Sequence, residues 1–138
     1  MALSVPLSRF TSLVGGGSAF YVRRTHHLFM KNTPPIPNSI GKRRSITVIT
    51  GAKRYFTIED EVSCEQPVPE KETRKQIYLQ KARFEDTGEI QYRFTYYMIG
   101  VKPGAKGRWV FGQYALFIPS EHLTCLLQEA RKRKWEGI

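Results

Sequence analysis

The chain has 138 residues, two cysteines and a formal net charge of +10 at pH 7. This length predicts one small domain, and two cysteines are too few for the disulfide framework of a small secreted protein. No apolar run reaches the roughly 18 residues that a membrane-spanning helix needs, so we expect no membrane span. Residues 1–50 carry seven of the basic side chains and no Asp or Glu, which leaves residues 51–138 with a net charge of only +3.

The first 50 residues predict a disordered organellar transit peptide. They lack acidic residues, are rich in Ser and Thr, and are interrupted by the stretches VGGGS and NTPPIPNS, as is typical of transit peptides. The Met-Ala start, the Ser-rich opening and Pro6 favour import into the chloroplast stroma. The mitochondrial matrix is the alternative, and a basic tail that binds RNA or membrane is a third interpretation. We expect removal between about Arg44 and Lys53.

Residues 51–75 predict an N-terminal arm or linker. The stretch YFTIEDEVS at 55–63 begins with residues that favour strands and then turns acidic, which indicates at most a short strand. The stretch CEQPVPEKETRK at 64–75 has two prolines, mixed charge and no hydrophobic period. The carboxylates at 59–61 could chelate a cation, although consecutive acidic residues usually form a solvated stretch.

Residues 76–138 predict a domain made of a β-sheet and a C-terminal helix. The clearest strand is IQYRFTYYMI at 90–99, because its side chains alternate regularly between two faces. Turn residues separate it from its neighbours. The other elements are expected to be a strand near 75–85, a turn at 86–89, a loop at 100–107 and a strand at 108–118.

The end of the chain predicts one amphipathic helix. Ser120 after Pro119 is a suitable N-cap, and Gly137 would end the helix. Its apolar stripe is expected to consist of Leu123, Leu126, Leu127 and Ala130. The fold class is therefore α+β, an antiparallel β-meander of three to four strands with one C-terminal helix packed on one face. This layout is similar to the four-strand-plus-helix units of the Whirly and PUR single-strand-binding families, although the chain carries neither family's sequence motif.

One helix can cover only one face of such a sheet. The more apolar face should meet the helix, and Gly112 would let the helix come close. The helix-facing residues are expected to be Tyr92, Phe94, Tyr96, Met98, Val110, Gly112, Tyr114, Leu116 and Ile118. The outer face is expected to present Lys81, Arg83, Arg93, Thr95, Tyr97, Trp109, Phe111 and Gln113.

The mixture of cations and aromatic rings on the outer face predicts a binding function, because an exposed patch of this kind usually meets a partner. Trp, Tyr, Phe and Arg are enriched at protein interfaces. We therefore expect an accessory or assembly protein that docks on an organellar complex or forms a homodimer. The alternative is single-stranded RNA or DNA, with bases stacked on the rings and cations on the phosphates. The candidate binding residues are Lys81, Arg83, Arg93, Tyr97, Trp109, Phe111 and Gln113, with Lys102 and Lys106 as supporting charge.

No catalytic, cofactor or metal site is expected. His122 and Cys125 lie three residues apart on the predicted helix and could form half of a metal site or a nucleophile pair. No second pair of ligands is close to them, and Cys64 lies alone in the predicted arm. The loop GVKPGAKG lacks the spacing of a phosphate-binding loop. We expect a protein that binds without catalysing a reaction.

Overall fold

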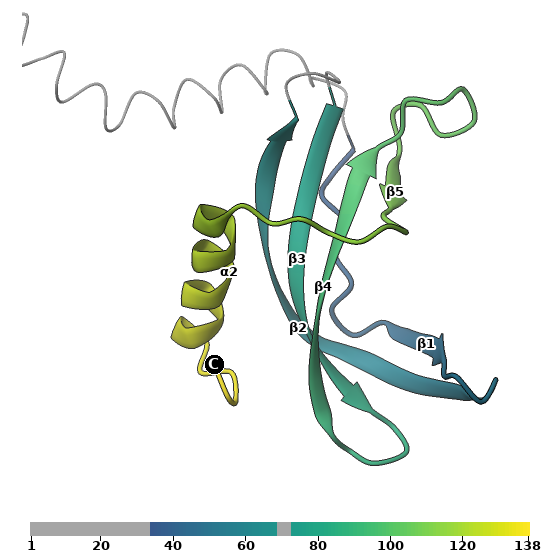
Figure 1. Ribbon diagram of the computed structural model, residues 1–138, viewed down its shortest axis with the longest axis vertical. Coiled ribbons are helices and arrows are strands. Elements are labelled where there is room, and N and C mark those ends of the chain that lie inside the picture. Colours follow the sequence, from purple (N-terminus) through teal and green to yellow (C-terminus); the bar gives the residue numbers. More distant parts are fainter. Residues whose placement is uncertain (1–33, 69–72) are drawn as a thin grey trace, which may run out of the picture. The chain divides into compact units, whose positions relative to one another are not determined.

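A computed structural model describes residues 34–68 and 73–138 (Figure 1); most of the predicted transit peptide lies outside the described residues. Within them, five antiparallel strands form one sheet in chain order, followed by a helix. The elements are β1 (Arg43–Thr47), β2 (Lys53–Val68), β3 (Thr73–Phe84), β4 (Ile90–Ile99), β5 (Trp109–Phe111) and α2 (Ser120–Lys132). The predicted α+β meander with one C-terminal helix is confirmed, with five strands in place of three or four.

The prediction of a linker over residues 51–75 is wrong, because this segment forms the longest strand of the sheet. β2 has 16 residues and pairs with β1 on one side and β3 on the other. β1 contacts only residues 53–57 of β2, so the far half of β2 is an edge. An edge tolerates Pro67, whose nitrogen cannot donate a hydrogen bond to a neighbouring strand.

A bulge in β2 explains why the sequence pattern concealed this strand. The register of β2 against β3 shifts between Ile58 and Asp60, which leaves Glu59 as an extra residue. An extra residue in one strand reverses the alternation of its side chains. Ile58 is consequently buried in one apolar cluster and Val62 in another, on the opposite face. A search for one continuous period therefore finds none.

The first face of the sheet, here called the helix face, packs against α2. Its core contains Val62, Ile77 and Leu79 from the strands and Leu126 and Ala130 from the helix. The predicted apolar stripe of the helix is thus confirmed at its centre. The helix begins at Ser120 with Pro119 as its N-cap and ends at Lys132, so the predictions that Ser120 is the cap and Gly137 ends the helix are wrong.

The second face of the sheet is covered by residues 34–42, which lie within the predicted transit peptide (Figure 1). The Tyr78 hydroxyl donates a hydrogen bond to the Pro37 carbonyl at 2.7 Å. The backbone N–H of Ser39, a buried residue, donates to Glu61 Oε1 at 2.8 Å. Residues Pro34–Ile138 form one compact unit, so residues 34–50, which the predicted boundaries of 1–50, 51–75 and 76–138 place in the transit peptide, pack with the sheet.

The strand predicted at 108–118 ends after three residues. The N–H of Gly112 donates to the Tyr96 carbonyl at 2.8 Å, and the chain then leaves the sheet and crosses the helix face toward α2 (Figure 1). Leu116 and Ile118 pack against the helix-face core on the way. The Tyr96 ring occupies the space that a Cβ of residue 112 would need. The glycine therefore accommodates Tyr96, and the prediction that it admits the helix is wrong.

The substitution Gly112→Ala is expected to lower the free energy of unfolding by about 1–3 kcal/mol, because the new methyl group would overlap the Tyr96 ring. Tyr96 is only 8% exposed, and its ring would have to shift to admit the methyl group. Denaturant unfolding measures the change. Gly104→Ala is the matched control, since a Cβ there meets nothing within 4 Å; equal losses in the two variants would contradict the prediction.

Candidate binding surface

The structure confirms which residues of β4 and β5 lie on the same face of the sheet. In the register of the two strands, Tyr97 pairs with Phe111 and Ile99 pairs with Trp109. These side chains lie on the face opposite α2, together with Arg93. Four of the seven candidate residues are therefore on the predicted face.

The placement of Lys81 and Arg83 on that face is wrong. Lys81 pairs in register with Tyr92, which packs against the helix-face core, and Arg83 shares its side of β3. Both cations are ion-paired with Glu59, Lys81 at 3.8 Å. The hydrophobic period does not identify the two faces of β3, because consecutive residues 76–80 are all buried. Neither face of the strand is therefore marked as polar.

The aromatic rings on the second face are partly engaged inside the protein. The Tyr97 ring makes edge-on contacts with Tyr78 at 5.6 Å and with Phe111 at 5.3 Å between ring centroids. Trp109 Nε1 donates to the Pro34 carbonyl at 3.0 Å. Phe111 is 43% exposed, so it is the most accessible of these rings. Of the aromatic surface predicted from the sequence, only the part at β5 is therefore accessible.

Two hollows flank the point where β5 ends. The first has a volume of about 350 Å³ and lies between β5 and the loop that includes Lys102. The second has a volume of about 280 Å³ and lies between β4 and the segment at 111–116. Gln113, which follows β5, lines both hollows. Lys106 forms an isolated bridge to Gly100 that helps to shape the loop.

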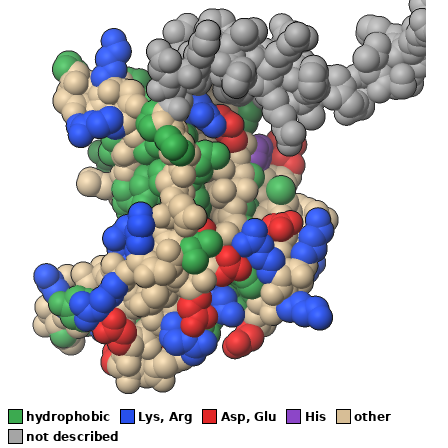
Figure 2. Space-filling model, turned by 180° about the vertical axis from the view of Figure 1, so that it is seen from behind, with side chains coloured by type: hydrophobic (Ala, Val, Ile, Leu, Met, Phe, Trp, Pro, Cys, Tyr) green, Lys and Arg blue, Asp and Glu red, His purple; other side chains and the backbone are tan. Residues whose placement is uncertain are grey.

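Large apolar side chains are exposed around these hollows. Tyr114 is 84% and Phe117 is 86% exposed, both on the segment that crosses to α2. Figure 2 shows hydrophobic side chains gathered over the upper part of the view, with Lys and Arg beside them. Residues 90–120 contain four basic residues and no Asp or Glu. The exposed apolar side chains of this region are here called the apolar surface. They are Phe94, Val101, Val110, Phe111, Tyr114 and Phe117.

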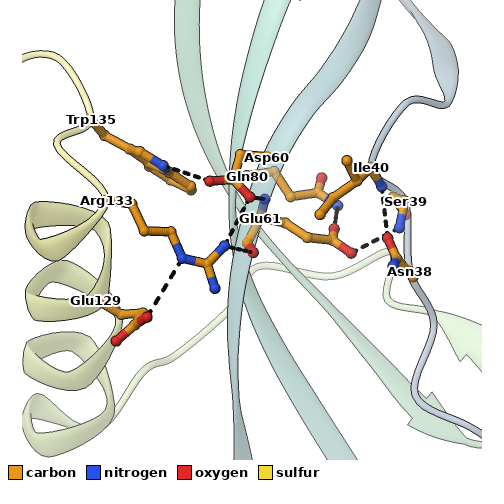
Figure 3. Close-up of polar contacts among 9 residues, drawn as sticks. All are labelled: Asn38, Ser39, Ile40, Asp60, Glu61, Gln80, Glu129, Arg133 and Trp135. Carbon is orange, nitrogen blue, oxygen red and sulfur yellow. Dashed lines mark hydrogen bonds and ion pairs between the residues drawn. The ribbon is translucent and has the colours of Figure 1, made fainter.

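A buried polar chain holds Arg93 at the second hollow. Glu61 Oε2 accepts a hydrogen bond from Gln80 Nε2 at 2.7 Å (Figure 3), and Gln80 Oε1 accepts one from Arg93 Nε at 2.8 Å. Burial lowers the pKa of the Arg93 guanidinium from its ordinary value. Among the residues that the structure describes, no carboxylate forms an ion pair with Arg93. The guanidinium is therefore oriented by a neutral amide.

The acidic run at 59–61 contributes to folding instead of forming a solvated stretch. Asp60 Oδ1 accepts from Arg133 Nη1 at 2.8 Å, and Asp60 Oδ2 accepts from Trp135 Nε1 at 2.9 Å (Figure 3). Glu61 turns to the second face and Glu59 to the cations of β3. Sequence reasoning missed these roles. The useful signal was Trp135, because the N–H of a buried Trp usually finds a hydrogen-bond acceptor.

His122 and Cys64 lie where β2 meets the first turn of α2. Burial raises the pKa of the Cys64 thiol to about 11, so this thiol stays protonated near neutral pH. His122 Nε2 lies 3.2 Å from the Glu65 carbonyl, and Cys125 is exposed with a free thiol. In residues 34–68 and 73–138, no three His, Cys, Asp or Glu side chains are grouped to hold a metal ion.

Over the same described ranges, no helix combines the length and apolar character needed to cross a bilayer. No protein-family model, curated protein or solved structure matches the chain at a significant level.

Proposed function

We propose that this chain is a non-enzymatic accessory or assembly protein that acts through a protein–protein interface. Its proposed location is the chloroplast stroma, with the mitochondrial matrix as the alternative. The observation that supports the interface is the exposure of several large apolar side chains around one short strand, Tyr114 and Phe117 above all. A contiguous exposed apolar patch is typical of a surface that meets a partner. The proposed interface is thus centred on the apolar surface, at the margin of the face predicted from sequence.

Single-stranded nucleic acid is the second candidate, and the charge of residues 90–120 favours it. Their four cations are not offset by any acidic residue in the same segment, as a phosphate-binding surface requires. We place protein first because Tyr97 is packed edge-on between two other rings. Lys81 and Arg83, on the helix side of β3, are paired with Glu59 and lie away from these rings.

The surroundings of Cys64 and His122, the candidate nucleophile and base, support the proposal of a binding function without catalysis. A thiol with a pKa of about 11 supplies almost no thiolate near neutral pH. His122 Nε2 lies beside a backbone carbonyl. Neither group is arranged as a nucleophile with its base.

For the targeting segment, we propose that processing occurs upstream of Pro34. Removal between Arg44 and Lys53 would delete β1 and the chain that covers the second face of the sheet. A mature protein that begins before Pro34 keeps both.

The double substitution Tyr114→Ser with Phe117→Ser is expected to reduce partner capture about tenfold or more, because it removes two exposed aromatic anchors. Capture is measured by quantitative cross-linking and affinity purification of the tagged full chain from the organelle. Ile49→Ser is the matched control, since Ile49 is an exposed apolar residue on the turn between β1 and β2.

Capture that is equal in the double variant and the control would contradict the proposed interface. A filter-binding titration with a mixed single-stranded oligonucleotide tests the second candidate. Binding that falls steeply with salt and is lost in the double variant would favour nucleic acid over protein.

A further inference from the structure

The edge of β4 next to β5 is open over most of its length. β5 pairs only with Tyr97–Ile99 of the ten-residue strand, and the bond from Gly112 N–H to the Tyr96 carbonyl is the last one. Backbone groups of successive residues in an antiparallel strand point alternately to its two neighbours. Glu89 accepts a bond from Phe84 of β3, so the odd-numbered residues of β4 face β3.

It follows that the N–H and C=O groups of Tyr92 and Phe94 point away from β3, toward the position that a longer β5 would occupy. Among the described residues, these four groups have no hydrogen-bonded partner. An exposed row of unpaired groups on a strand edge is a template for another strand. Strand addition at such an edge is a common way for a protein to bind an extended peptide.

The open edge is bordered by a preformed recess. The second hollow, of about 280 Å³, is lined by Arg93 and Phe94 of β4 on one side and by residues 111–116 on the other. The Phe94 ring is 42% exposed on the helix side of the strand. An added strand would therefore find an apolar contact on one face and a cation on the other.

The Arg93 guanidinium is held beside two aromatic rings. It lies 5.0 Å from the centroid of the Phe56 ring and 5.9 Å from that of Phe111, and Nε is held by the buried Gln80. Its lowered pKa reflects the desolvation of this position. A partly desolvated guanidinium with its direction already fixed loses little freedom when it pairs with an anion.

The charge around the edge selects among the occupants. Arg44 pairs in register with Phe56, whose ring lies under Arg93, so two cations lie near each other on the second face. They would repel the same surface of a second copy and attract an acidic partner. A nucleic acid has no alternating row of N–H and C=O groups to pair with Tyr92 and Phe94. An extended polypeptide backbone has such a row of N–H and C=O groups.

We propose that the open edge of β4 at residues 90–95 accepts an extended acidic segment of a partner protein as an additional strand, with one carboxylate of that segment paired to Arg93. This inference rests on the proposed protein-binding function and names the chemistry of the partner.

Fluorescence anisotropy of the full chain with a labelled peptide of alternating Glu and Val tests the proposal. The peptide is expected to bind, a Gln-and-Val peptide to bind about tenfold more weakly, and a backbone N-methylated Glu-and-Val peptide not to bind. Absence of binding by the first peptide, or equal binding of all three, would overturn the proposal.

Substitutions separate the two parts of the site. Arg93→Gln is expected to lower affinity for the Glu peptide about tenfold and to leave affinity for the Gln peptide unchanged. Arg83→Gln makes the same charge change on the other face and should alter neither. Phe94→Pro removes an outward N–H and should abolish binding, whereas Phe94→Ala retains the N–H and part of the affinity. Circular dichroism melting checks that each variant folds.

Three other results would reassign the edge. Equal effects of Arg93→Gln and Arg83→Gln would remove the carboxylate site. Displacement of the peptide by a single-stranded oligonucleotide, in a manner sensitive to Arg93→Gln, would favour nucleic acid. A dimer in light scattering that Phe94→Pro dissociates would favour a second copy. If partner capture survives Arg93→Gln and Phe94→Pro but not the Tyr114 and Phe117 substitutions, the edge proposal fails and the proposed function stands.

Discussion

A chain that begins at Gly51 is expected to melt at least about 10 °C below the full chain or not to fold, whereas a chain that begins at Pro34 should melt with the full chain. The shorter chain loses β1, which pairs with residues 53–57. It also loses the Pro37 carbonyl that accepts from Tyr78 and the Ser39 N–H that donates to Glu61. Removal of residues 34–42 also exposes the second face of the sheet to water, at a cost of about 25 cal/mol for each Å² of apolar surface.

The size of the effect follows from the small domain. In a domain of about 100 residues, a loss of 1 kcal/mol lowers the melting temperature by roughly 4–8 °C, so the lost strand and the uncovered face account for 10 °C or more. Thermal melting by circular dichroism compares the three chains. Equal melting temperatures for the chains from Pro34 and from Gly51 would show that residues 34–50 are dispensable. The same comparison tests the proposal that processing occurs upstream of Pro34.

Asp60→Ala is expected to lower the free energy of unfolding by about 1–4 kcal/mol. The carboxylate joins β2 to the end of α2, because it accepts from both Arg133 and Trp135. Without it, the indole N–H of the buried Trp135 has no acceptor, at a cost of about 1–3 kcal/mol. The exposed ion pair with Arg133 adds up to about 1 kcal/mol.

Asp86→Ala is the matched control for this substitution. Asp86 also binds an arginine, Arg54, through two contacts at 2.7 and 3.0 Å, but it lies in an exposed turn and joins no second layer. We expect a smaller loss there than at Asp60, because water screens an exposed ion pair. Denaturant unfolding measures both, and a double-mutant cycle of Asp60→Ala with Trp135→Phe isolates the indole bond. Equal losses at Asp60 and Asp86 would contradict the structural role of Asp60.

The two proposed contact regions lie next to each other at one end of β5. The apolar surface includes Phe94 and Phe111, and the second hollow lies between them. A partner strand on β4 would also reach the exposed segment that carries Tyr114. One extended partner could therefore engage the edge, Arg93 and the apolar surface together, which is why the variants above are chosen to separate them.

The sequence by itself determined those elements that have one buried and one exposed side. The alternation of residues 90–99 identified β4 and, with the aromatic residues after it, the relative faces of β4 and β5. The spacing of Leu126 and Ala130 identified the buried stripe of α2. In these segments the local period records the side that the solvent does not reach, so it can be read without knowledge of the partner.

Only the tertiary structure decided the rest. The bulge at Glu59 exchanges the faces of β2 partway along the strand, and β3 is buried on both sides, so neither strand has a period that marks one face. The cover of the second face comes from Pro37 and Ser39, about 40 and 20 positions from their partners Tyr78 and Glu61. Local composition reports whether a residue prefers burial, but it does not report which distant segment will bury it.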